Sequence, residues 1–210
     1  YEKARRLQPN NPRILNSMAW NQIKQKKYQE AKQLVQQSLA VDGANPKTWH
    51  LKGKLAEVDK DVDLALMAYQ TALKVSVNED VVILRALAGV YVLKGELEKA
   101  NEYVTQILAQ NASDAEALLL QSWILAKQNN NDKASEIQKT LLENLSLVPE
   151  EEFKQRVSLL FIRGLTAFSQ GKIEQARSDL SSYIAQAPGD LQAVKLLLEL
   201  YNQQGDFNEA

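Results

Sequence analysis

The sequence contains no cysteine and a single histidine, His50, among its 210 residues. Without cysteine there are no disulfides, thiolate nucleophiles or cysteine-ligated zinc sites. One imidazole cannot form a histidine pair at a metal, and nothing near His50 in the sequence supports a Ser-His-Asp triad. The eight glycines are scattered singly, so no glycine-rich phosphate loop is present. We therefore predict no catalytic, metal-ligating or cofactor-binding residue, no cofactor and no enzymatic activity.

The sequence also lacks an excess of either charge and lacks long apolar runs. Lys and Arg number 25 against 26 Asp and Glu, so no net positive charge is available to hold nucleic acid or an anionic membrane surface. No stretch of about eighteen uninterrupted apolar residues occurs. We predict neither a nucleic-acid partner nor direct membrane insertion. With 45% hydrophobic and 24% charged residues, the chain has the composition of a folded protein.

The sequence does contain an internal repeat, which is anchored on alanine. The anchors are separated by 34, 35, 34, 42 and 34 residues and are Ala31, Ala65, Ala100, Ala134, Ala176 and Ala210. A bulky residue stands sixteen places before each anchor, at Leu15, Trp49, Leu84, Leu118, Leu160 and Val194. Four places after it comes a small residue, at Ala19, Gly53, Ala88, Ser122 and Gly164, whereas the last repeat has Leu198. A fixed period in this range is typical of helical repeats.

Each repeat also contains a turn signal five residues before its anchor. The turn residues are Lys26, Lys60, Gly95, Asn129, Gly171 and Gly205. Apolar residues then follow the anchor at helical spacing, as in Tyr69 and Ala72 after Ala65. Each repeat is therefore predicted to be a helix, a short turn and a second helix, with small residues that let the two helices approach closely.

This pattern resembles the tetratricopeptide repeat family over essentially the whole chain, and Trp49, Gly53, Ala65, Tyr69 and Ala72 keep the family's residues best. The resemblance implies an all-α fold, a right-handed superhelical solenoid of helix-turn-helix pairs. It predicts a single array over residues 1–210, an excerpt of a longer one. In that array residues 1–11 are the second helix of a preceding repeat, and the repeats lie near 12–45, 46–80, 81–114, 115–156, 157–190 and, truncated, 191–210.

The fourth repeat carries eight extra residues around 145–152. Pro149 and the following Glu150 to Glu152 indicate a new helix start, because proline fits the first turn and acidic residues suit the positive end of the helix dipole. We expect the extra length to elongate the helices of this repeat.

The resemblance places function in a concave groove lined by the first helices. First-helix side chains that fall off the packing stripe are expected to project into it: Asn16, Trp20, Lys24, His50, Lys54, Glu57, Arg85, Leu119, Trp123, Lys127, Phe161, Leu165, Phe168, Lys195 and Glu199. Trp20 and Trp123 stand five residues beyond Leu15 and Leu118 and so turn away from the packing face. An exposed tryptophan on such a wall indicates contact with a ligand. The alternative is that the two rings pack against a neighbouring helix. Likewise, Phe161, Leu165 and Phe168 either contact a partner or belong to the core of the fifth repeat.

The resemblance implies a non-enzymatic scaffold that binds a protein or peptide partner in the groove. Residues 163–206, with Arg163-Gly164-Leu165 and Pro188-Gly189, are similar to tetratricopeptide lipoproteins found beside bacterial exosortase and exopolysaccharide genes. This likeness implies a role in polysaccharide export or assembly at the bacterial cell envelope or periplasm, with the cytoplasm as the alternative. Two other functions remain open. One is direct binding of polysaccharide by stacking of Trp20, Trp123 and Phe161 on sugar rings. The other is recruitment for an enzyme whose catalytic domain lies outside this segment.

Overall fold

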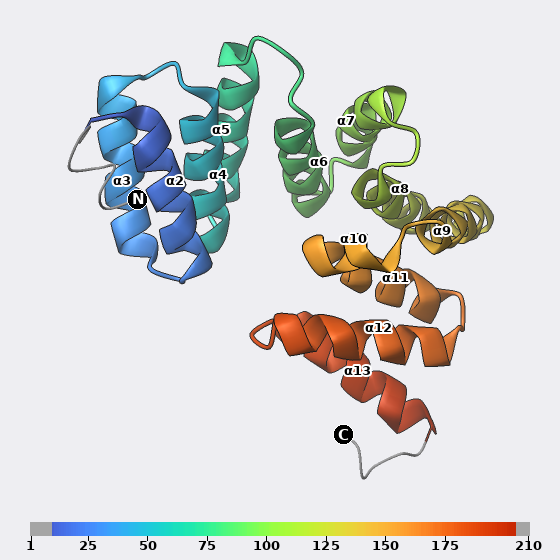
Figure 1. Ribbon diagram of the computed structural model, residues 1–210. Coiled ribbons are helices and arrows are strands. Elements are labelled where there is room, and N and C mark those ends of the chain that lie inside the picture. Colours follow the sequence, from blue (N-terminus) through green and yellow to red (C-terminus); the bar gives the residue numbers. More distant parts are fainter. Residues whose placement is uncertain (1–9, 205–210) are drawn as a thin grey trace. The chain divides into compact units, whose positions relative to one another are not determined.

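The computed structural model of this chain describes residues 10–204. That part consists of twelve helices and contains no strand, which confirms the all-α helical-repeat class (Figure 1). The helices are α2 (Pro12–Lys24), α3 (Tyr28–Val41), α4 (Pro46–Val58), α5 (Val62–Val75), α6 (Val81–Lys94), α7 (Leu97–Gln110), α8 (Ala115–Lys127), α9 (Asn131–Ser146), α10 (Glu150–Gln155), α11 (Ser158–Ser169), α12 (Ile173–Gln186) and α13 (Leu191–Gln204). Most of the helix predicted over residues 1–11, the turn residue Gly205 and the anchor Ala210 lie outside the described residues.

The chain divides into two compact units, where the sequence predicts one continuous array. Unit 1 ends at Ile107 and unit 2 begins at Leu108, so the division falls in the last turn of α7. A division of this kind is compatible with a helical array, because each repeat contacts only its neighbours and no contact ties distant repeats together.

The first helices of five repeats begin at an asparagine or aspartate that caps them. Each accepts a hydrogen bond from a backbone N–H two or three residues further on, at 2.9, 3.3, 2.9, 2.9 and 3.0 Å for Asn11, Asn45, Asp80, Asp114 and Asp190. Proline occupies the first turn after the two asparagines, where its missing N–H costs nothing. A side-chain cap of this kind stabilises a helix by about 1 kcal/mol.

The turn inside each repeat has one residue with left-handed backbone. It is Lys26, Lys60, Gly95, Asn129 or Gly171, with φ between 60° and 76°. The next residue donates its N–H to the carbonyl five residues earlier, as in Asp61 to Ala56 and Lys172 to Ala167, both at 2.9 Å. This is the hydrogen bond of a Schellman motif, which ends the first helix and starts the second. These are the five described turn positions that the repeat spacing predicts.

Within a repeat, a small residue on the first helix lets a bulky residue on the second helix come close. A Cβ placed on Gly53 in α4 would lie 2.4 Å from the ring of Tyr69 in α5, and Tyr69 is fully buried. In unit 2 a Cβ on Gly164 in α11 would lie 3.0 Å from Leu180 Cγ in α12. The anchors Ala31, Ala65, Ala100, Ala134 and Ala176 are all buried.

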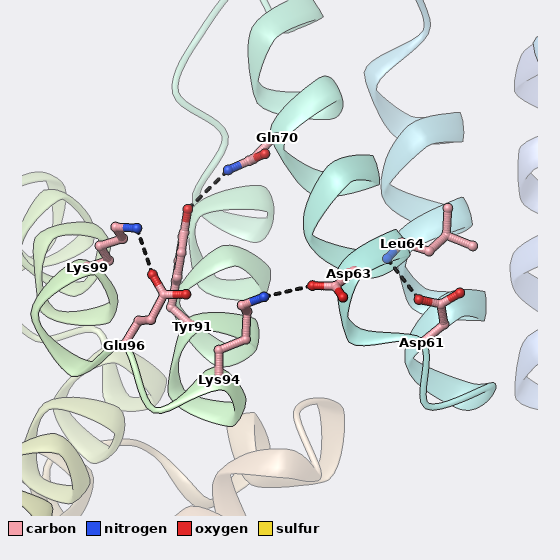
Figure 2. A network of polar contacts seen from close by, with 8 residues as sticks. All are labelled: Asp61, Asp63, Leu64, Gln70, Tyr91, Lys94, Glu96 and Lys99. Atoms are coloured by element: carbon pink, nitrogen blue, oxygen red, sulfur yellow. Dashed lines mark hydrogen bonds and ion pairs between the residues drawn. The ribbon is translucent and has the colours of Figure 1, made fainter.

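In unit 1, polar contacts join α5 to α6, which belong to successive repeats (Figure 2). The Asp63 carboxylate accepts from Lys94 Nζ at 2.7 Å, and Gln70 Nε2 donates to the Tyr91 hydroxyl at 3.0 Å. The hydrogen bond from Lys94 lowers the pKa of Asp63. Tyr91 also stacks on Tyr103 of α7, with ring centroids 5.7 Å apart.

The extra residues of the fourth repeat elongate only one helix. α9 has 16 residues, whereas α3, α5 and α7 have 14 each. The remaining residues form the separate helix α10, which Pro149 caps and Glu150 to Glu152 open. α10 is held to unit 2 by the buried Phe153, whose ring lies 3.8 Å from the guanidinium carbon of Arg163. Arg163 in turn forms a two-pronged ion pair with the buried Asp179 of α12, at 2.7 and 2.9 Å.

We predict that Lys60→Gly raises the free energy of unfolding by about 1 kcal/mol, because left-handed backbone is costly for a residue with a Cβ. Urea denaturation of the purified chain measures this change. Gly95→Ala is the converse control: its φ is +76° and no atom lies within 4 Å of an added Cβ, so it should be destabilising through backbone strain alone. A loss of stability in Lys60→Gly would contradict the assignment of this turn.

We predict that Gly53→Ala lowers the free energy of unfolding by about 1–3 kcal/mol, because the added methyl group overlaps the ring of Tyr69. The matched control is Gly89→Ala in α6, where an added Cβ meets nothing within 4 Å and helix propensity favours alanine. Thermal unfolding of both variants measures the difference. Equal stability of the two variants would show that Tyr69 does not depend on the space at residue 53.

Candidate functional site

Unit 1 contains a hollow of about 350 Å³ bounded by the first helices of three successive repeats. We call it the unit 1 hollow. Its lining comes from α2, from α4 and from the beginning of α6: Asn16, Ser17, Trp20, Lys47, His50, Leu51, Asp80, Val82 and Ile83. Three of these residues, Asn16, Trp20 and His50, were expected from the sequence to face a groove.

Trp20 is the most conspicuous residue at this hollow because 40% of it is exposed. Lys24, one helical turn later, places Nζ 5.5 Å from the centre of the Trp20 ring. A cation near an indole at this distance is attracted to the π-face. The ring is therefore accessible and has a favourable contact with Lys24.

His50 lies between the hollow and the interior of the second repeat. Its ring centroid is 5.5 Å from that of Tyr69, and its Nε2 is buried with no hydrogen-bond partner among the described residues. Burial, assisted by the positive charge of Lys54, lowers the pKa of His50 from 6.5 to about 4, although Asp80 opposes the shift. The imidazole is therefore neutral at pH 7 and adds no charge to the hollow.

Asn16 is more buried than its place in the sequence indicates, because only 7% of it is exposed. Its amide nitrogen donates to Thr48 Oγ1 at 2.8 Å, and that hydroxyl lies 3.0 Å from Ser38 Oγ. Thr48 and Ser38 are fully buried. Asn16 reaches the edge of the hollow, but its polar atoms serve to join α2 to α4.

The other predicted residues of unit 1 are partly covered. Lys54 and Glu57 are half-buried and form an ion pair of 3.7 Å along α4. Arg85 in α6 is half-buried. None of the three lines the unit 1 hollow.

In unit 2, Trp123 repeats the arrangement of Trp20. It is 40% exposed, and Lys127 Nζ lies 5.1 Å from its ring centre. The two tryptophans occupy the same position of the first and fourth repeats, five residues after Leu15 and Leu118.

The remaining predicted residues of unit 2 divide into packed and exposed ones. Leu119, Phe161 and Phe168 lie half-buried against the hydrophobic clusters of this unit. Leu165 is half-buried in α11, whereas Lys195 and Glu199 are exposed on α13. Most of the apolar surface predicted for this part of the groove thus stabilises the helices.

Several residues at the hollow were not predicted from the sequence. Lys47, Asp80 and Val82 lie at helix beginnings, where one turn of helix is too short to show which face it buries. In the sequence, these residues are recognisable only as residues at or next to the N-caps of α4 and α6.

Among the described residues there is no group of three or more His, Cys, Asp or Glu side chains able to hold a metal ion. Within residues 10–204, no helix has both the length and the apolarity needed to cross a membrane.

The sequence profile of the tetratricopeptide repeat family matches residues 85–146 and 163–210, which together make up just over half of the chain. The chain belongs to the tetratricopeptide repeat family. The fold of this family typically serves protein–protein interaction, and its members are generally non-catalytic scaffolds. A search of curated proteins finds no significant match.

Solved structures share the tetratricopeptide fold at low sequence identity. A chain of the Cut9–Hcn1 hetero-tetramer of APC/C is 15% identical with a TM-score of 0.72, and the match covers 97% of this chain and 39% of that one. YrrB, described as a TPR protein with an unusual peptide-binding site, is 17% identical with a TM-score of 0.59, covering 93% and 96%. PilF of Pseudomonas aeruginosa is 13% identical with a TM-score of 0.62, covering 94% and 86%. These likenesses show the fold alone.

We predict that the chain loses stability on acidification partly through His50. Because the pKa of His50 is about 4 in the folded chain and 6.5 in its ordinary state, the unfolded chain binds the proton more readily. The contribution of His50 is complete above about pH 6.5 and falls by up to about 1.4 kcal/mol per pH unit as the pH drops towards 4. Chemical denaturation between pH 7 and pH 4.5 should therefore show a steeper loss for the wild type than for His50→Leu. Parallel pH profiles would contradict a buried neutral imidazole.

Proposed function

We propose that this chain is a non-catalytic scaffold that binds a protein or peptide partner, with the unit 1 hollow as one of its contact points. The supporting observation is that first helices of three successive repeats form one hollow with an exposed tryptophan at its rim. Tryptophan is among the residues that most often dominate binding energy at protein interfaces.

The size and lining of the hollow suit a side chain of a partner. Its volume of about 350 Å³ is near the lower end of ligand sites, which span about 300–1,000 Å³. Trp20, Leu51, Val82 and Ile83 give it apolar walls, and Lys47 and Asp80 place charges at its edge. YrrB is described by a peptide-binding site, which makes a peptide segment a reasonable first partner to test.

We predict that Trp20→Ala weakens partner binding by about 1–3 kcal/mol, as truncation of an interface tryptophan usually does, and that adding Trp123→Ala weakens it further. The partner is identified by a pull-down with the purified 210-residue chain and mass spectrometry of the retained proteins. Calorimetric titration with that partner then measures the loss of binding free energy in each variant. Both tryptophans are 40% exposed, so helicity by circular dichroism should be unchanged.

The matched control is Met67→Ala. Met67 is 42% exposed but lies on α5, a second helix. Partners captured equally by the wild type and the tryptophan variant, but lost with Met67→Ala, would move the binding surface to the second helices. Loss of helicity in Trp20→Ala would instead make Trp20 part of the structural core.

A second candidate function is direct binding of polysaccharide, and the exposed indoles of Trp20 and Trp123 favour it because sugar rings stack on aromatic faces. Titration of exopolysaccharide against tryptophan fluorescence separates the two functions. A saturable change that Trp20→Ala abolishes would support carbohydrate binding, whereas a protein scaffold gives no change.

The place of action that we propose is the bacterial cell envelope, in export or assembly of a surface polysaccharide. Its support is the likeness of residues 163–206 to lipoproteins of that kind. Comparing pull-downs from envelope and cytosolic fractions tests this location. Capture of a polysaccharide-assembly component from the envelope fraction supports it, and specific capture from the cytosol alone refutes it.

A further inference from the structure

A second hollow of unit 1, of about 420 Å³, is formed by α3, α4 and α5. α3 and α5 are the second helices of the first two repeats, and α4 packs against both of them (Figure 1). Among the residues that line it are Val35, Gln36, Leu55, Ala56 and Asp59. We call it the Ala56 hollow. It shares no lining residue with the unit 1 hollow.

The next repeat has an aromatic ring where this hollow has only a methyl group. Ala56 stands nine residues before the anchor Ala65, and Tyr91 stands nine residues before the anchor Ala100. The Tyr91 ring is buried, and it stacks on Tyr103 of α7 with the ring centroids 5.7 Å apart. α6 thus fills with its own side chain the space that α4 leaves open.

The hydrogen-bond donor for such a ring is present at both places. Gln70, five residues after the anchor of its repeat, donates from Nε2 to the Tyr91 hydroxyl at 3.0 Å (Figure 2). Gln36 is five residues after the anchor Ala31 and lines the Ala56 hollow. Gln36 is exposed, and its side chain has no hydrogen-bond partner between residues 10 and 204. The Ala56 hollow therefore keeps the donor and lacks the phenol.

The rest of the lining suits a ring that carries one neutral polar group. The floor is apolar and buried and consists of Val35, Leu55 and Ala56. At the edge, Lys32 and Asp59 neutralise each other in an ion pair of 2.7 Å. The Nζ of Lys52 lies 4.6 Å from the centre of the Trp49 ring. The volume lies within the range of about 300–1,000 Å³ that ligand sites span.

We propose that the Ala56 hollow binds a tyrosine side chain of a partner protein, which takes the place that Tyr91 occupies in the next repeat. This inference rests on the proposed function and adds a contact point outside the unit 1 hollow. The ring packs on Val35 and Leu55, and its hydroxyl accepts a hydrogen bond from Gln36. A tyrosine at an interface contributes both a large apolar area and a polar tip.

The first experiment supplies the missing ring from the chain itself. Ala56→Tyr should raise the midpoint of thermal unfolding by a few degrees, because the ring fills the hollow and removes apolar surface from water. The reverse change, Tyr91→Ala, should lower that midpoint, since it opens an equivalent hollow in the next repeat. A lower midpoint for Ala56→Tyr would show that the hollow does not accept a tyrosine ring, and would overturn the inference.

The second experiment selects ligands from a displayed library of random twelve-residue peptides. The target is the full 210-residue chain, and peptides that also bind the Ala56→Tyr variant are removed. This step discards ligands of every other surface, including the unit 1 hollow. We expect the remaining peptides to share a tyrosine. Recovery of no peptide, or of peptides without a common tyrosine, would contradict the proposal.

The third experiment tests the hydrogen bond from Gln36. Each selected peptide is labelled with a fluorophore and compared with its Tyr→Phe version by fluorescence polarisation. Loss of the hydroxyl should weaken binding to the wild type about two- to tenfold, the usual worth of one hydrogen bond, and should make no difference in Gln36→Leu. The matched control is Gln37→Leu, an exposed neighbour on α3 that does not line the hollow. The same preference for tyrosine in Gln36→Leu as in the wild type would refute the site.

The outcomes separate this inference from the proposed function. If the pull-down finds a partner whose binding depends on Trp20, and Ala56→Tyr affects neither that partner nor any peptide, the inference fails and the scaffold function stands. If neither the pull-down nor the peptide selection yields a specific ligand, both fail. Tyrosine peptides that Ala56→Tyr excludes, in a variant that circular dichroism shows to be folded, support the inference.

Discussion

The fold depends on how closely the two helices of each repeat approach. Helices of 13 or 14 residues are marginal by themselves in water, so packing of one against the other must stabilise them. At Gly53 the missing side chain is replaced by the fully buried ring of Tyr69, and at Gly164 by Leu180. The left-handed turn between the helices fixes where the second one begins. The close approach of the helices and the left-handed turn both depend on residues close together in the sequence. The sequence of each repeat therefore determines its own helix pair.

This locality explains how much of the fold was predictable from the sequence. Turn residues and buried alanine anchors recur at the same positions of each repeat. The five described turns, from Lys26 to Gly171, all have a residue with left-handed backbone. The burial of Asn16 could not be predicted from the sequence, because it depends on Thr48 and Ser38, which belong to other helices. The unit 1 hollow was found only in part, since Lys47 and Asp80 stand at helix beginnings where periodicity does not distinguish one face from another.

The inserted residues of the fourth repeat are accommodated by charge as well as by apolar packing. Arg163 covers the ring of Phe153 and binds Asp179, while its third nitrogen lies 3.3 Å from Glu150. Neighbouring Asp179 and Glu150 offset the cost of burying this guanidinium and raise its pKa. A buried ion pair loses much of its attraction to desolvation, so its effect here is to fix how α10, α11 and α12 meet. The repeat pattern could not predict the contacts of Arg163, because the insertion occurs in only one repeat.

The two lysines in left-handed turns have a consequence for how this chain changes over evolutionary time. Neither Lys26 nor Lys60 lines the unit 1 hollow, so exchanging either for glycine alters the folded population and leaves the lining of that hollow as it was. A shift of 1–2 kcal/mol changes the abundance of a protein in the cell several-fold, because the unfolded fraction is what proteases and chaperones engage. Selection can therefore adjust the lifetime of this chain at its turns without changing the residues that line the hollow.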